Sequence, residues 1–340
     1  MKRSNFLYII YFLIIIGITF FLTIKIANRE INFNTFLGLK SVNEDKFLND
    51  EECVLNFVSS MSSVKNYRKV NSYGLSDYNY SYYKPKGVFR IIALGDSMTF
   101  GHGVDIDESW PKQLEKKLNQ LNTSREFEVL NFGKVGANTK EELDLFKKEG
   151  IKYNPDLIIL QIYPDDWFNE KCRNERKIKL LDNISWSPKI QVYLNSSSED
   201  ELNKFLDTLC FIQYFENLDE NEKKNEIDRN FLNPLFKLAK IANEKNISMV
   251  IVAWDFQPFP NILLSKVPCI QKAMKNYFNN GDYIFEKISK IPNIKFLDLS
   301  QYLPYSEEIR LKDAHLNKRG YEIVSDRIME FLKSGVVIPN

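Results

Sequence analysis

Along most of the chain, segments with the hydrophobic pattern of a strand alternate with segments that have the pattern of a helix. Short, largely apolar runs predict strands at residues 89–94, 128–131, 156–162, 247–253 and 294–297. Runs with apolar residues at helical spacing predict helices at 110–121, 139–149 and 232–244, and a last helix from Asn317. Strands that alternate with helices in this way indicate an α/β fold, with a three-layer, doubly wound (flavodoxin-like) parallel sheet of about five strands.

The N-terminal region has a different pattern, because residues 6–24 contain no charged side chain. A helix needs about 20 apolar residues to cross the ~30 Å hydrocarbon core of a bilayer. The run is longer than the apolar region of about 7–15 residues in a cleaved signal peptide, so an uncleaved transmembrane anchor (signal-anchor) is favoured. The alternatives are a cleaved signal peptide, with its site near Ile26 and Ala27, and a buried soluble helix, for which the run lacks a polar face.

Positive charge on both sides of this run leaves its orientation less clearly marked. The flanking basic residues are Lys2, Arg3, Lys25 and Arg29. For a first and only span we expect the N-terminus inside and the rest of the chain outside the cytoplasm. In that compartment Cys172 and Cys210 could form a disulfide, although the sequence does not establish the pairing.

The predicted elements divide the chain into an anchor at 1–28, a stalk and lead-in segment at 29–87, and an α/β domain at 88–335. Gly and Pro residues punctuate the end of the lead-in, which predicts an ordered loop or short strands there. The segment 167–231 is longer than an ordinary connection within a compact domain, which predicts an insertion there. That insertion forms either a lid or substrate wall, or a surface decoration.

The composition describes a globular protein of 340 residues, with 44% hydrophobic and 27% charged residues. Lys and Arg number 46 against 45 Asp and Glu, so the net charge of +1 gives no electrostatic argument for nucleic-acid binding. The four cysteines include no CxxC pair, which excludes a zinc module or a disulfide scaffold. The chain has 2 histidines, so any mechanism that needs imidazole must use His102 or His315.

A serine follows the first predicted strand in the sequence GDSMTFGHGV, residues 95–104. Ligands of doubly wound sheets bind beyond the carboxyl ends of the strands, where Ser97 is therefore expected. A nearby helix N-terminus would supply backbone N–H groups that stabilise an anion. Alternatively, the segment only caps the next helix, with Asp96 holding the turn. The segment is not the G-x-S-x-G elbow of another hydrolase fold.

The last predicted helix is preceded by the sequence KDAHLN, in which Asp313 stands two residues before His315. A serine nucleophile needs a base to take its proton, and that base needs a carboxylate to fix its tautomer. Asp313 and His315 suit these two roles. Alternatively, Asp313 or Asn317 caps the helix and His315 is a surface residue. His102 is the competing base, but its loop position close to Ser97 restricts its reach, so His315 is favoured.

Four segments, in this order, give the chain a resemblance to the SGNH/GDSL hydrolases. They are GDSMTFG (95–101), NFGKVGANT (131–139), PDLIILQIYPDDWF (155–168) and DAHLNKRGY (313–321). The resemblance covers roughly residues 71–166 and 290–333. The four segments together are far more specific than any one of them.

The resemblance implies that Ser97 is the nucleophile, that His315 and Asp313 complete a catalytic triad, and that the backbone N–H of Gly136 helps to hold the oxyanion. Family members act mostly on esters, so the implied activity is that of a serine esterase or acylhydrolase. Its substrate would be an O-acyl glycan, a lipid or a similar ester at the cell envelope. The resemblance implies no metal and no organic cofactor.

Two positions depart from the family pattern. Asp165 stands where an asparagine usually donates into the oxyanion hole, and an ionised carboxylate would repel the developing charge. Losing one such donor costs about 10²–10³ in rate, so Asp165 would act protonated, or Asn138 or Asn169 would donate instead. Asp313 lies two residues before the histidine, where three is common. The further candidates for the binding site are Asp96 and Asp166.

Two other functions stay open beside the esterase. The chain is alternatively an O-acyltransferase that passes the acyl group to a hydroxyl of a surface glycan, or a catalytically degenerate SGNH-like envelope-binding protein, which Asp165 would explain. Trp254, Asp255 and Phe256 follow the fourth predicted strand. They suit a sugar ring or an acyl chain at the ligand edge of the sheet, or equally a place in the core.

Overall fold

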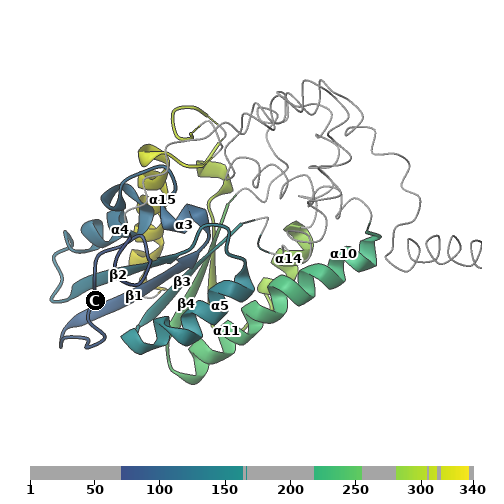
Figure 1. The fold of residues 1–340 in the computed structure, drawn as a ribbon, viewed down its shortest axis with the longest axis horizontal. Helices are drawn as coiled ribbons and strands as arrows, with labels where there is room; N and C mark the ends of the chain where they lie inside the picture. Colours follow the sequence, from purple (N-terminus) through teal and green to yellow (C-terminus); the bar gives the residue numbers. More distant parts are fainter. Residues whose placement is uncertain are drawn as a thin grey trace, which may run out of the picture. The chain divides into compact units, whose positions relative to one another are not determined.

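A sheet of five parallel strands in the order β2-β1-β3-β4-β5 organises the α/β domain (Figure 1). The computed structural model describes residues 70–163, 166, 218–254, 281–304, 306–311 and 315–336. The strands are β1 (Val88–Gly95), β2 (Glu126–Gly133), β3 (Leu157–Ile162), β4 (Ser248–Ala253) and β5 (Ile294–Asp298). Each predicted strand is present, and the strand order is that of the flavodoxin-like doubly wound fold.

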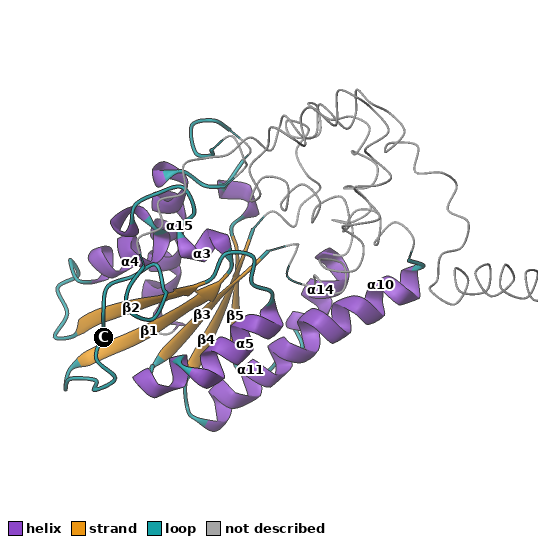
Figure 2. Cartoon of the chain, viewed as in Figure 1, coloured by secondary structure: helices purple, strands orange, loops and turns teal. Residues whose placement is uncertain are grey.

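Helices cover both faces of this sheet (Figure 2). On one face lie α4 (Trp110–Leu118) and α15 (Lys318–Phe331), and on the other lie α5 (Thr139–Lys148) and α11 (Asn233–Glu244). The other helices described are α3 (Ser97–Phe100), α10 (Glu220–Ile227) and α14 (Gly281–Ile288), with 3₁₀ turns at Ile106–Glu108, Gly150–Tyr153 and Ser300–Tyr302 and π-helical turns at Asp228–Leu232 and Leu332–Val336. The helix α14 has no counterpart among the predicted helices.

The elements begin where local sequence signals place them. Every residue of β3 is buried, as expected for a central strand covered on both faces. Pro111 occupies the first turn of α4, and Asn138 caps α5 in a reciprocal pair with Glu141. Asn317 caps α15, because its Oδ1 accepts hydrogen bonds from two backbone N–H groups of the first turn.

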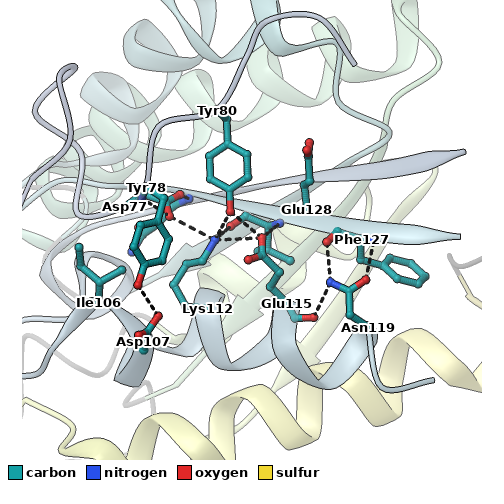
Figure 3. Close-up of polar contacts among 12 residues, drawn as sticks. Asp77, Tyr78, Tyr80, Ile106, Asp107, Lys112, Glu115, Asn119, Phe127 and Glu128 are labelled. Atoms are coloured by element: carbon teal, nitrogen blue, oxygen red, sulfur yellow. Dashed lines mark hydrogen bonds and ion pairs between the residues drawn. The ribbon is translucent and has the colours of Figure 1, made fainter. Parts of the chain in front are cut away.

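The last part of the predicted lead-in, residues 70–87, contains turns but no strand and is bonded to α4. Asp77 Oδ1 lies 3.1 Å from Nζ of the buried Lys112, and the Tyr80 hydroxyl donates to Glu115 Oε2 at 2.9 Å (Figure 3). Of the two predicted forms for this stretch, an ordered loop and short strands, the structure contains the ordered loop.

Several predictions concern residues outside the described ranges. They are the apolar run at 6–24, the stalk up to residue 69, Cys172, Cys210 and the part of the insertion between 167 and 217. The part of the insertion that is described continues as helix, since α10 leads through the π-helical turn into α11. Among the helices that the structure describes, none has the length and apolar character that a membrane crossing requires.

Candidate active site

Ser97 follows β1 after one intervening residue, Asp96, and is the first residue of the four-residue helix α3. We call residues 95–102 the serine turn. Asp96 is the N-cap of this helix, and its Oδ1 accepts a hydrogen bond from the N–H of Met98 at 2.8 Å. Asp96 is buried, so its carboxylate caps the helix from within the folded domain. The structure therefore gives Asp96 the capping position and places Ser97 at the carboxyl end of the sheet.

Two glycines allow α3 to lie directly on the sheet. A Cβ atom on Gly95 would be 2.2 Å from Thr99 Oγ1 and 2.5 Å from Gln161 Oε1. A Cβ atom on Gly133, at the end of β2, would be 2.1 Å from the backbone nitrogen of Phe100. Any side chain at these positions would push α3 and its serine away from the strands, because the room is already occupied.

Two buried amide side chains connect the neighbouring strands to the serine turn. Gln161 of β3 accepts a hydrogen bond from Thr99 Oγ1 at 2.9 Å through its Oε1. Asn131 of β2 donates from Nδ2 to the carbonyl oxygen of Phe100 at 3.5 Å. Neither residue is among the sequence-based candidates. For Gln161 the available signal was a single amide in an otherwise apolar strand, because buried polar side chains need hydrogen-bond partners.

The structure brings Ser97 and His315 together across 218 positions of the chain, with 2.8 Å between Ser97 Oγ and His315 Nε2. Backbone hydrogen bonds hold the loop that carries the histidine. The carbonyl of His315 accepts from the N–H of Leu311 at 2.7 Å, and the N–H of Asn317 donates to the carbonyl of Ile309 at 2.9 Å. A serine hydroxyl in contact with an imidazole nitrogen has a base within reach of its proton.

The second histidine of the chain, His102, lies beside His315. His102 is 2% exposed, and its ring centroid is 4.3 Å from that of His315, with 35° between the two planes. The N–H of His102 donates to the carbonyl of Ser97 at 3.0 Å, which keeps this residue within the serine turn. Sequence patterns suggest His102 only as a competing base. They contain no signal for its contact with His315, because the two rings meet only in the folded chain.

Two candidates for oxyanion binding, Gly136 and Asn138, lie in the turn between β2 and α5. Gly136 is exposed and has φ +70°, a conformation that favours glycine. Asn138 Oδ1 accepts from the N–H of Glu141 at 3.0 Å, so this oxygen serves the cap of α5. The N–H of Lys134 donates to the carbonyl of Gly95 at 3.0 Å, which places this turn beside the serine turn.

The residues after β3 and β4 have structural partners. Asp166 is fully buried, and its Oδ2 accepts from the N–H of Tyr163 at 2.7 Å, which closes the turn after β3. Trp254 after β4 is also fully buried, within the apolar core, so the core alternative is correct for this residue. The candidates Asp165, Asn169, Asp255, Phe256 and Asp313 lie outside the described residues.

Comparisons with known proteins find similar solved structures, but no matching family model and no matching curated protein. A lipase from a goat rumen metagenome has 18% identity and a TM-score of 0.44, over 71% of this chain and 96% of that one. A carbohydrate acetylesterase family member from Sinorhizobium meliloti has 11% identity and a TM-score of 0.42, over 74% and 100%. A GDSL-like lipase from Bacteroides thetaiotaomicron has 14% identity and a TM-score of 0.39, over 72% and 88%.

Proposed function

We propose that the chain is a serine esterase or acylhydrolase in which Ser97 is the nucleophile and His315 the general base. The observation that supports this most directly is the 2.8 Å distance between Ser97 Oγ and His315 Nε2. A serine hydroxyl is a weak nucleophile by itself, and a hydrogen-bonded base activates it. The site also lies at the carboxyl end of β1, and the order of the strands reverses between β1 and β3. Doubly wound folds bind their ligands at such a reversal point.

In the proposed reaction, Ser97 Oγ attacks the carbonyl carbon of an ester, and its proton passes to His315 Nε2. The leaving alcohol then takes that proton, which leaves the acyl group on Ser97. Water then attacks the carbonyl carbon of this acyl-enzyme and gives a proton to His315. When the resulting tetrahedral intermediate breaks down, His315 returns the proton to Ser97 Oγ and the acid is released. Asp313 would orient His315, and the N–H groups of Ser97 and Gly136 would bind the oxyanion.

Labelling by a fluorophosphonate probe and hydrolysis of p-nitrophenyl acetate test this mechanism. Ser97→Ala is expected to lose the label and to lower kcat/KM by ~10³-fold or more, because the activated nucleophile is gone. Ser334→Ala removes an exposed serine in the C-terminal π-helical turn and is the matched control, expected to behave as wild type. A Ser97→Ala protein that hydrolyses the ester as fast as wild type contradicts the mechanism.

Two further outcomes separate the alternatives. Wild-type protein that binds a glycan but takes no label at Ser97 would indicate the degenerate binding protein. Transfer of acetyl to a sugar hydroxyl in excess of free acetate would indicate the O-acyltransferase, since both enzymes share the acyl-Ser97 intermediate and differ only in the acceptor.

We also propose that the substrate is an O-acylated glycan, a lipid or a similar ester at the cell envelope, with residues 6–24 as the membrane anchor. The uncharged run supports this location, because its length suits a single crossing. Extraction of membranes with alkaline carbonate is the measurement. An anchored chain stays in the membrane pellet, whereas a chain recovered wholly in the wash contradicts the anchor.

A further inference from the structure

The two imidazole rings of this chain differ in how they meet the serine turn. His315 reaches Ser97 Oγ with the edge of its ring, through Nε2 at 2.8 Å. His102 lies against the ring of His315, with centroids 4.3 Å apart and 35° between the planes. His102 is 2% exposed, so it is a buried neighbour of the proposed base and is poorly placed to touch a substrate.

His102 is fixed to the same turn as the serine. Its N–H donates to the carbonyl of Ser97 at 3.0 Å. Gly101 and Gly103 on either side have φ of +83° and +82°, and this left-handed backbone on both sides reverses the chain tightly around the histidine. The imidazole of His315 therefore meets one closed turn at two points, with its Nε2 at Ser97 and with its ring tilted against that of His102.

A second contact matters because the backbone alone does not set the direction of Nε2. The carbonyl of His315 is held by the N–H of Leu311 at 2.7 Å, but the ring still turns about its side-chain bonds. One hydrogen bond to Ser97 still permits a range of orientations of the His315 ring. The flat ring of His102 packed against it narrows that range.

We propose that His102 is a positioning residue that holds the His315 ring so that Nε2 points at Ser97 Oγ. The proposal rests on the proposed function of Ser97 and His315. His102 would act on the rate of the chemical step and leave substrate binding largely unchanged, because it contacts the base rather than the open edge of the sheet. A flat aromatic side chain at position 102 should be enough for this role.

Three variants with p-nitrophenyl acetate test the requirement for a flat ring. His102→Ala and His102→Leu are expected to lower kcat by ~10–100-fold, with KM within about twofold, because a small misplacement of a reacting group costs that much. His102→Phe keeps a flat ring and should stay within about threefold of wild type. Thermal unfolding identifies any variant that fails to fold. Equal losses in folded Leu and Phe variants, or no loss in folded Ala and Leu variants, overturn the proposal.

A double-mutant cycle separates positioning from a general effect on the turn. In a His315→Ala background, His102→Leu should have no further effect on the residual activity, because the ring it positions is absent. An equal loss in both backgrounds would show that His102 acts independently of His315, and the proposal is then wrong. Ser97→Ala is measured in parallel. If that variant keeps full activity the proposed function fails, whereas an inactive Ser97→Ala beside a fully active His102→Leu refutes only the positioning role.

Discussion

Gln161 connects the central strand β3 to the residues around Ser97. Its Oε1 accepts from Thr99 Oγ1 at 2.9 Å and from the N–H of Asp96 at 3.4 Å, and both donors belong to the serine turn. The side chain is 0% exposed, so bulk water does not reach these donors if the amide is lost. An apolar side chain would leave them desolvated without this acceptor, which costs roughly 1–3 kcal/mol.

Replacing Gln161 with Met should therefore affect both stability and rate. Met has a similar length and adapts to the space, so the change removes the acceptor without leaving a large cavity. We expect urea unfolding to show a loss of about 1–3 kcal/mol. We expect kcat for p-nitrophenyl acetate to fall by ~10-fold or more, as the serine turn shifts.

Leu160→Met is the matched control, because Leu160 is the preceding buried position of β3 and its side chain points to the other face of the sheet. A volume-conserving change of this kind usually costs less than about 1.5 kcal/mol and should leave kcat near wild type. If Gln161→Met has the kcat of wild type, the amide does not position the serine turn.

At the scale of elements, the lead-in segment is joined to the sheet by buried charge. Asp77 Oδ1 is 3.1 Å from Lys112 Nζ on α4, and Asp77 Oδ2 accepts from the N–H of Asn131 on β2 at 2.7 Å (Figure 3). Burial raises the pKa of Asp77 from 3.8 to about 6, although the ammonium of Lys112 opposes the shift. The loop at 70–87 is therefore part of the folded domain rather than a free linker.

This burial predicts a pH dependence of stability. An acid whose pKa is higher in the folded state binds its proton more tightly there, so the contribution of Asp77 to the free energy of unfolding falls as the pH rises from about 4 to about 6. Asp77→Asn removes this titration. The difference in unfolding free energy between wild type and Asp77→Asn should fall by about 2 kcal/mol between pH 4 and pH 7 in urea titrations.

Glu286→Gln is a control with the opposite sign. The exposed Glu286 has its pKa lowered, chiefly by a hydrogen bond from Lys290. Its ionised form contributes stability that is lost as the pH falls. The difference in the free energy of unfolding between wild type and Glu286→Gln should therefore rise with pH. A difference between wild type and Asp77→Asn that stays constant with pH contradicts the buried titration of Asp77.

At the scale of the whole domain, the order of the strands assembles the site. The strand β1 lies between β2 and β3, so the loops after these three strands leave the sheet side by side. The helix α15 packs against α4, where Lys117 Nζ donates to Ser325 Oγ at 2.8 Å, and this packing places the loop before α15 over the serine turn. Both atoms of the contact between Ser97 and His315 thus belong to the predicted domain at 88–335.

Deletion of residues 1–28 should therefore release an active, soluble enzyme. The truncated chain retains the lead-in with Asp77, and we expect its kcat for p-nitrophenyl acetate to be within about twofold of the full chain in detergent, because a domain with its own core folds alone. Ser97→Ala in the truncated chain controls for background hydrolysis. A truncated protein that unfolds as cooperatively as the full chain but has lost its activity would show that the site needs the N-terminal region.

Most of the local structure could be predicted from the sequence. The five strands lie within two residues of their predicted ends, and Pro111, Asn138 and Asn317 each sit at the start of the expected helix. These signals are read from residues that are neighbours in the chain, since strand and helix periods and caps involve only a few successive positions. The end of a helix is marked less strongly, and α4 stops at Leu118 rather than at residue 121.

By itself, the sequence determined the α/β alternation, the strand that precedes Ser97 and the two histidines among which a base had to be found. Only the tertiary structure decided that His315 meets Ser97, that the ring of His102 lies against that of His315, and that Trp254 belongs to the core. The physical reason is that such contacts join segments far apart in the chain. They depend on strand order, on register and on close packing across the sheet, which no local pattern of hydrophobic and polar residues encodes.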